Sequence, residues 1–132
     1  MVFVDSDALI ALRVNKDLHF SAAKKILKEL KERNEILATS WQVIDEVTTK
    51  LSFFTTKAEA LWFLQWAVKT NLQIVYVDDS LAGKIINKFK QQRSKRVSLT
   101  DCTNMVIAKK MGVKTFFSFD KHYQQNGFEL LG

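Results

Sequence analysis

The sequence lacks proline altogether and has only four glycines, one cysteine and two histidines. With Cys102 alone, an internal disulfide framework and a multi-cysteine zinc site are both excluded, and we expect Cys102 to be a small buried apolar residue. His19 and His122 are too few and too far apart in the chain to indicate a histidine-based metal site. A metal site in this protein would therefore have to use oxygen ligands.

Long hydrophobic runs are also missing, since no apolar stretch approaches the ~20 residues that cross a bilayer. The chain starts without a basic segment ahead of an apolar one, and two aspartates interrupt its first apolar run, "VFVDSDALIAL". This pattern is not that of a secretory signal. We therefore expect a cytoplasmic protein.

No Pro-rich or Gly-rich linker, repeat or low-complexity segment divides the 132 residues, which indicates a single domain over residues 1–132. Short apolar runs alternate with segments of helical periodicity. Strands are predicted at 2–5, 36–39, 72–77, 114–119 and 128–131, and helices at 8–14, 21–33, 41–51, 56–69, from Asp79 or Ser80 to 92, and 98–111. The fold class is therefore α/β, with a mostly parallel sheet of about four to five strands and helices on both faces.

The net charge of +6 favours an anionic partner, and nucleic acid first among such partners. Residues 84–96, "KIINKFKQQRSKR", carry six basic side chains and no acidic one, whereas the lysines of residues 24–35 alternate with glutamates as on a solvated helix. The first stretch is the better candidate for phosphate contact. Its candidate substrate-binding residues are Lys90, Arg93, Lys95 and Arg96.

Four carboxylates are expected near the carboxyl ends of the strands, where open α/β sheets form their binding sites. Each also has a purely structural explanation: Asp5 as a helix cap, Glu46 in an i,i+4 pair with Lys50, Asp101 in a capping box with Ser98, and Asp120 at a turn. Clustered carboxylates repel one another unless a cation neutralises them, and hard oxygen ligands favour Mg²⁺ or Mn²⁺. Metal-assisted phosphodiester hydrolysis is the hypothesis that uses all four: Asp5, Glu46, Asp101 and Asp120.

Four segments, "VFVDSDALIAL", "SWQVIDEVTTKL", "SLTDCTNMVIAKKMGVKTFFSFDKHY" and "GFELL", together resemble the PIN-domain nucleases, and most of all the small VapC-like toxins of VapBC toxin–antitoxin pairs. The resemblance implies a PIN-like α/β/α sandwich that cleaves RNA with Mg²⁺ or Mn²⁺. It further implies an antitoxin partner that binds near the acidic pocket, and a homodimer.

The resemblance also assigns roles to particular residues. Asp5 and Asp101 would coordinate the metal directly, while Glu46 and Asp120 would do so directly or through water and help to orient the attacking hydroxide. Ser6 takes the position of a small hydroxyl residue beside the first aspartate. Asp7 departs from the family pattern, and we interpret it as a helix N-cap. Asp45, next to Glu46, leaves that assignment open by one residue, since ~100° of helical rotation separates the two.

Two other functions compete with the nuclease. "DSDAL" also resembles the first motif of haloacid-dehalogenase-like phosphatases, in which Asp5 would be the nucleophile and Asp7 the general acid, with "VDDS" at 77–80 as a later acidic motif. The other alternative is a non-catalytic basic RNA-binding module whose acids are caps and surface charges.

Trp62 and Trp66, at i,i+4 on one helix, indicate a core or a subunit interface.

Overall fold

The computed structural model describes all residues from 1 to 132 as five strands and seven helices. The elements are β1 (Val2–Val4), α1 (Ser6–Arg13), α2 (Phe20–Glu32), β2 (Leu37–Ser40), α3 (Trp41–Phe54), α4 (Lys57–Lys69), β3 (Gln73–Val75), α5 (Asp79–Gln91), α6 (Leu99–Met111), β4 (Thr115–Phe117), α7 (Lys121–Gln125) and β5 (Glu129–Leu131). The predicted α/β class is confirmed, and every predicted strand and helix is present. Only the short helix α7 was not predicted.

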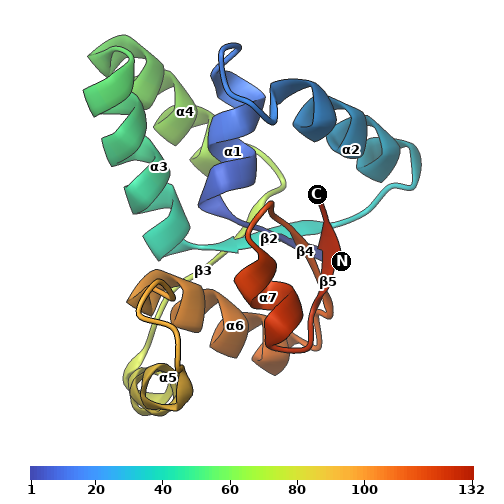
Figure 1. Ribbon diagram of the computed structural model, residues 1–132. Helices are drawn as coiled ribbons and strands as arrows, with labels where there is room; N and C mark the ends of the chain where they lie inside the picture. The colour runs from blue at the N-terminus through green and yellow to red at the C-terminus, as the bar shows by residue number, and fades with distance from the viewer.

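The five strands form one sheet in the order β3-β2-β1-β4-β5, and every pair of neighbours is parallel. The chain first builds outward from β1 to β3 and then returns to add β4 and β5 on the other side of β1 (Figure 1). The order of the strands therefore reverses between β1 and β4, and such a switch point leaves a crevice at the carboxyl ends of the two strands.

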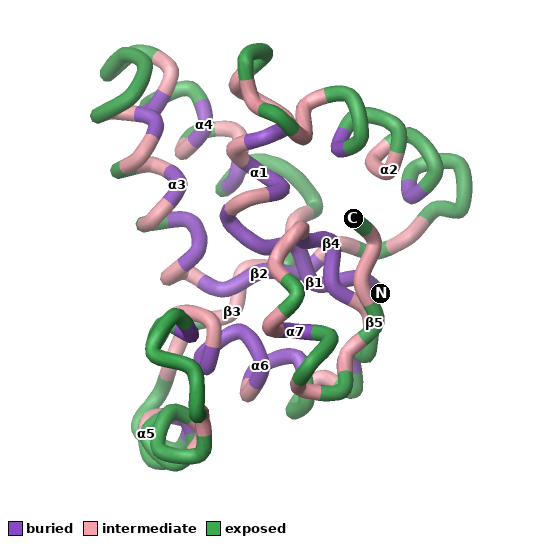
Figure 2. Tube along the Cα trace, in the orientation of Figure 1, coloured by how far each residue is buried: buried purple, intermediate pink, exposed green.

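Alternate strand residues supply two separate cores, one on each face of the sheet. Val4 and Phe117 belong to the core beneath α1, α2, α3 and α4, whereas Phe3 and Phe116 belong to the core beneath α5, α6 and α7. Helices α1, α3 and α6 contribute many fully buried residues, while α2 and α5 lie outside them and are mostly exposed (Figure 2). The arrangement is a three-layered α/β/α sandwich.

Several predicted helix ends are confirmed by their capping contacts. The Ser40 side chain accepts a hydrogen bond from the amide of Val43, and Ser98 forms a capping box with Asp101 at the start of α6. Gly112 ends α6 in the left-handed region, with φ of 71°. The cap of α5 was predicted one or two residues too late, because Asp78 rather than Asp79 or Ser80 accepts the bond from Leu81.

The prediction that Cys102 is buried is confirmed, because it lies completely inside the core beneath α6. Trp62 and Trp66 stack with their ring centroids 6.3 Å apart. Trp66 packs on the opposite core, whereas Trp62 is 47% exposed, and a subunit interface at this helix stays a prediction. None of the helices is long and apolar enough to cross a membrane.

Candidate functional site

The four predicted carboxylates lie at one end of the sheet, near the switch point. Asp5 directly follows β1, Asp120 is the N-cap of α7 after β4, Asp101 is the third residue of α6, and Glu46 lies in the second turn of α3. They are close enough to influence one another. The pKa of Asp5 is raised by Asp101 and Glu46 in addition to burial, and that of Asp101 by Asp120 and Glu46.

Asp5 is the most deeply placed of these acids, with only 4% of its surface exposed. Burial is the main reason why its pKa lies well above the ordinary value of 3.8, and the neighbouring Asp7 raises it further. The backbone amide of Ser6 acts in the opposite direction and favours the ionised form. Asp5 is therefore a buried carboxylate in an acidic neighbourhood, an arrangement that a bound cation would stabilise strongly.

Asn104 holds the Asp5 carboxylate in place, and sequence reasoning missed this residue. Its Nδ2 donates to Asp5 Oδ1 at 3.1 Å and to the Tyr123 hydroxyl at 3.0 Å, while its Oδ1 accepts from Ser40 Oγ at 2.7 Å. Asn104 is fully buried, and these contacts join α6 to β1, β2 and α7. The only feature of the sequence that indicated Asn104 was its position three residues after Asp101. This spacing puts the two side chains on the same face of helix α6.

Ser118, at the end of β4, is the second residue that sequence reasoning missed. Its hydroxyl lies 3.2 Å from Asp5 Oδ2 and 3.1 Å from Asp7 Oδ2, and it accepts a bond from the amide of Asp120. One hydroxyl hydrogen cannot serve two carboxylates at once. Burial is the main reason why the pKa values of Asp5 and Asp7 are raised, while the bond from Ser118 lowers the pKa of Asp7.

The N-cap interpretation of Asp7 was wrong. Asp5 occupies the N-cap position of α1 without a side-chain capping bond, and Asp7 lies in the first turn of the helix. Asp7 Oδ2 accepts from the amide of Phe119 at 2.8 Å as well as from Ser118, so Asp7 ties α1 to the segment after β4. Its pKa is raised mainly by burial and also by Asp120.

Glu46, Asp101 and Asp120 also form the structural contacts that the sequence suggested for them. Each of these contacts uses mainly one of the two carboxylate oxygens. Glu46 Oε1 pairs with Lys50, Asp101 Oδ2 accepts from the amide of Ser98, and Asp120 Oδ1 accepts from the amide of His122 and lies 2.8 Å from its Nδ1. Glu46 Oε2 and Asp120 Oδ2 accept no hydrogen bond from the protein, and Asp101 Oδ1 has only a 3.4 Å contact with Tyr123. Each group thus keeps an oxygen for a ligand. Asp45, by contrast, is exposed.

The donor set fits a hard divalent cation such as Mg²⁺ or Mn²⁺. The candidate ligands are carboxylate oxygens, and burial, together with their mutual repulsion, raises the pKa values of Asp5 and Asp101. No three His, Cys, Asp or Glu side chains converge into a group that would hold a metal ion by themselves. An ion at these carboxylates would therefore need water and substrate phosphate to complete its shell.

The four predicted basic substrate-binding residues lie in the segment that precedes Asp101. Lys90 lies in the last turn of α5, and Arg93, Lys95 and Arg96 lie in the α5–α6 loop that leads to Asp101. None of the four forms an ion pair within the chain, and the loop carries them at the surface. Ser6 is different, because it is 7% exposed and its hydroxyl contacts no polar group of the protein.

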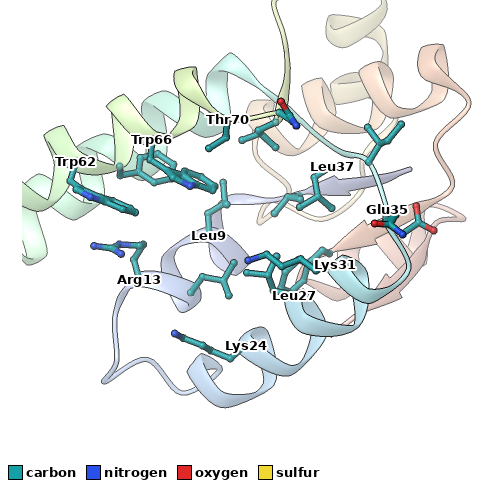
Figure 3. A pocket seen from close by; sticks show the side chains of 18 residues that line it. Leu9, Arg13, Lys24, Leu27, Lys31, Glu35, Leu37, Trp62, Trp66 and Thr70 are labelled. Carbon is teal, nitrogen blue, oxygen red and sulfur yellow. The ribbon is translucent and has the colours of Figure 1, made fainter.

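One cavity lies away from the carboxylates. It has a volume of about 700 Å³ and lies between α1, α2 and α4, where Leu9, Leu27 and Trp66 line it (Figure 3). Its rim includes residues just before β2 and β3, at the opposite ends of the strands from Asp5. None of the four candidate carboxylates lines it.

The phosphatase-like arrangement is not formed. Its later acidic motif would be "VDDS" at 77–80, but Asp78 caps α5 and its side chain is occupied by Leu81 and Ser80. Asp78 follows β3, which β2 separates from β1. The acids that do influence Asp5 are Asp7, Asp101 and Glu46, and the last two belong to the set that the nuclease interpretation requires.

A parallel sheet in the order 3-2-1-4-5 with carboxylates at its switch point defines a class of α/β folds, and a family model specifies the class further. The model described as PIN domain matches residues 2–129, so the chain belongs to the PIN domain family. The family resemblance inferred from the motifs is thereby confirmed.

Two solved structures share the fold. A crystal structure of Mycobacterium tuberculosis VapC20, described as a sarcin–ricin loop cleaving toxin, is 21% identical, with a TM-score of 0.86 over 97% of this chain and 96% of that one. A toxin–antitoxin complex from Klebsiella pneumoniae contains a chain that is 15% identical, with a TM-score of 0.63 over 92% of this chain and 88% of that one. No curated protein matches the sequence significantly.

Proposed function

We propose that this protein is a metal-dependent endoribonuclease and the toxin of a toxin–antitoxin pair. The observation that carries the proposal is Asp5, a buried carboxylate at the switch point whose pKa is raised first by burial and then by three neighbouring carboxylates. Membership of the PIN domain family supports hydrolysis of phosphodiester bonds. The similar fold of VapC20, a toxin that cleaves the sarcin–ricin loop, supports RNA as the substrate.

Asp5 and Asp101 would hold a Mg²⁺ or Mn²⁺ ion, with Glu46 and Asp120 acting directly or through water. The ion would supply an activated water and neutralise charge on the leaving oxygen. The chain itself contributes the orientation of the ligands: Asn104 and Ser118 fix the two oxygens of Asp5, and Ser98 fixes Asp101. Lys90, Arg93, Lys95 and Arg96 would hold the RNA backbone beside the carboxylates.

The decisive experiment incubates purified protein with mixed RNA and Mn²⁺ or Mg²⁺, beside an Asp5→Asn variant and an EDTA control. We expect cleavage only by the unaltered protein with metal. A folded protein that binds RNA equally with and without EDTA, and cuts none of it with any of these metals, would instead be a non-catalytic basic RNA-binding module.

The toxin role is tested separately in cells. Expression of the unaltered chain is expected to slow growth, and expression of the Asp5→Asn variant at the same level is not. A protein antitoxin that masks the acidic pocket should relieve the effect when it is expressed together with the chain. The expected homodimer is tested by light scattering of the purified protein.

A further inference from the structure

A second cavity, of about 470 Å³, lies between the end of α5, the α5–α6 loop and α7. Only one apolar residue, Val97, lines it, and no carboxylate does. We call it the amide cleft, because four of its eight lining residues carry side-chain amides. The lining residues are Lys88, Gln91, Gln92, Arg93, Ser94, Val97, Gln125 and Asn126.

The floor of the amide cleft is held by a reciprocal pair of hydrogen bonds. Gln92 Nε2 donates to Asn126 Oδ1 at 3.1 Å, and Asn126 Nδ2 donates to Gln92 Oε1 at 3.1 Å. Each amide is also anchored to a backbone carbonyl, of Lys88 and His122 respectively. These bonds fix the end of α5 against the end of α7, so the cleft is already formed without a ligand.

The rim, unlike the floor, keeps its polar groups available. Gln91 and Gln125 are exposed and form no side-chain hydrogen bond, and Lys88 and Arg93 form no ion pair. An amide offers a donor and an acceptor side by side, which is the arrangement that pairs with the edge of an adenine base. Lysine and arginine bind the phosphate that accompanies such a base.

The amide cleft lies directly beside the candidate metal site. Ser94 Oγ, in its wall, is 3.5 Å from His122 Nε2, and His122 Nδ1 is 2.8 Å from Asp120 Oδ1. On the other wall, Val97 is followed by Ser98, which binds Asp101. A strand of RNA whose phosphate lay at the carboxylates would therefore place a neighbouring nucleotide at this cleft.

We propose that the amide cleft is a nucleotide subsite that reads one unpaired adenine next to the cleavage position. Gln91 and Gln125 would contact the base edge, and Lys88 and Arg93 its phosphate. Unpaired RNA is the matching substrate class, because its base edges are accessible to side chains. The inference rests on the proposed nuclease function, since it assumes that RNA crosses the neighbouring carboxylates.

The test measures binding separately from cleavage. Fluorescently labelled single-stranded oligoadenylate and oligouridylate are titrated in EDTA with the unaltered protein, with a Gln91→Ala/Gln125→Ala double variant and with a Lys88→Ala/Arg93→Ala double variant. Gln65→Ala and Lys69→Ala are the matched controls, because both residues are exposed on α4, in the opposite layer. Circular dichroism checks that every variant is folded.

We expect the unaltered protein to prefer oligoadenylate by about tenfold, the size of one good amide–base contact. The glutamine double variant should lose this preference, whereas the Lys88/Arg93 double variant should weaken both RNAs equally and reduce the salt dependence of binding. Equal affinity of the unaltered protein for both RNAs, or a preference that survives in the glutamine variant, would overturn the subsite. Absence of cleavage with metal would overturn the proposed function alone, because these titrations do not depend on it.

Discussion

Asn104 Nδ2 lies 3.1 Å from Asp5 Oδ1, although 99 residues separate the two in the chain. This contact joins the first strand to α6 inside the protein, and Ser40 and Tyr123 share the same amide. Because every donor and acceptor of the Asn104 side chain is used, the Asp5 carboxylate has one fixed orientation. A carboxylate that is already held in place loses little conformational freedom when it binds a metal ion.

Replacing Asn104 by alanine should destabilise the protein. Ser40, Asp5 and Tyr123 would each lose a buried partner, at a cost of about 1–3 kcal/mol for each group left unsatisfied. Urea unfolding followed by circular dichroism measures the loss. Asn87→Ala, at an exposed position of α5, should change the free energy of unfolding by less than about 0.5 kcal/mol. Equal stability of the two variants would show that the Asn104 network contributes nothing.

Asp5→Asn should stabilise the metal-free protein at neutral pH. Burial raises the pKa of Asp5 in the folded state well above the ordinary value of 3.8. At a pH between the ordinary pKa and the raised one, the folded state therefore binds a proton more tightly than the unfolded state. Stability from this group is therefore greatest at low pH and falls as the pH rises through the folded-state pKa. Removing the charge should gain about 0.5–2 kcal/mol at pH 7 and flatten this part of the pH profile. If the stability of Asp5→Asn depended on pH in the same way as that of the unaltered protein, Asp5 would not be the cause of the fall in stability with rising pH.

Divalent metal should raise the melting temperature of the unaltered protein. An ion that binds only the folded state stabilises it by about 2.7 kcal/mol at a hundredfold excess over its dissociation constant. EDTA should reverse the shift, and the shift should be absent from Asp5→Asn. If the metal raised the melting temperatures of the unaltered protein and of Asp5→Asn equally, its binding site would not include Asp5.

Glu46→Gln and Asp45→Asn form a matched pair of charge-neutralising changes on adjacent residues of α3. Glu46 is partly buried and raises the pKa of Asp5 and Asp101, whereas Asp45 is exposed. We expect Glu46→Gln to lower the rate of RNA cleavage by about 10- to 100-fold and Asp45→Asn to leave it nearly unchanged. Similar losses from both would contradict the assignment of Glu46.

Asp7→Asn separates the nuclease from the phosphatase hypothesis. Asp7 binds Ser118 and Phe119 as well as influencing Asp5, so its amide analogue should weaken RNA cleavage without abolishing it. A phosphatase with Asp7 as its general acid would lose all activity. Hydrolysis of a generic phosphomonoester by the unaltered protein, abolished in Asp7→Asn, would support the phosphatase.

Much of the fold was predictable because the strands and helices carry strong local signals. The runs at β1 and β4 are apolar and short, and Ser40, Ser98 and Gly112 mark helix ends with side chains or conformations that suit those positions. Helix α7 was missed because it has only five residues and follows an aspartate that equally suits a turn. The start of α5 differs from prediction because two adjacent aspartates can both cap a helix.

The candidate site was predictable only in part. The carboxylates were found because each lies just after a strand or in the early turns of a helix, and parallel strands end at one edge of the sheet. Asn104 and Ser118 were not found, because their importance depends on which strands are neighbours. The β1–β4 pairing that places Ser118 next to Asp5 joins residues 113 positions apart, and no local pattern encodes it. The same contact explains why Asp7 was misassigned.

The placement of β4 beside β1 has a consequence for synthesis on the ribosome. Until residues 115–120 emerge, the first strand has an unpaired edge, and neither Ser118 nor Asp120 is present to complete the cleft. A nascent chain that stops earlier holds Asp5 without its later partners. A chain built in this order completes its candidate site only after the segment around β4 has been translated.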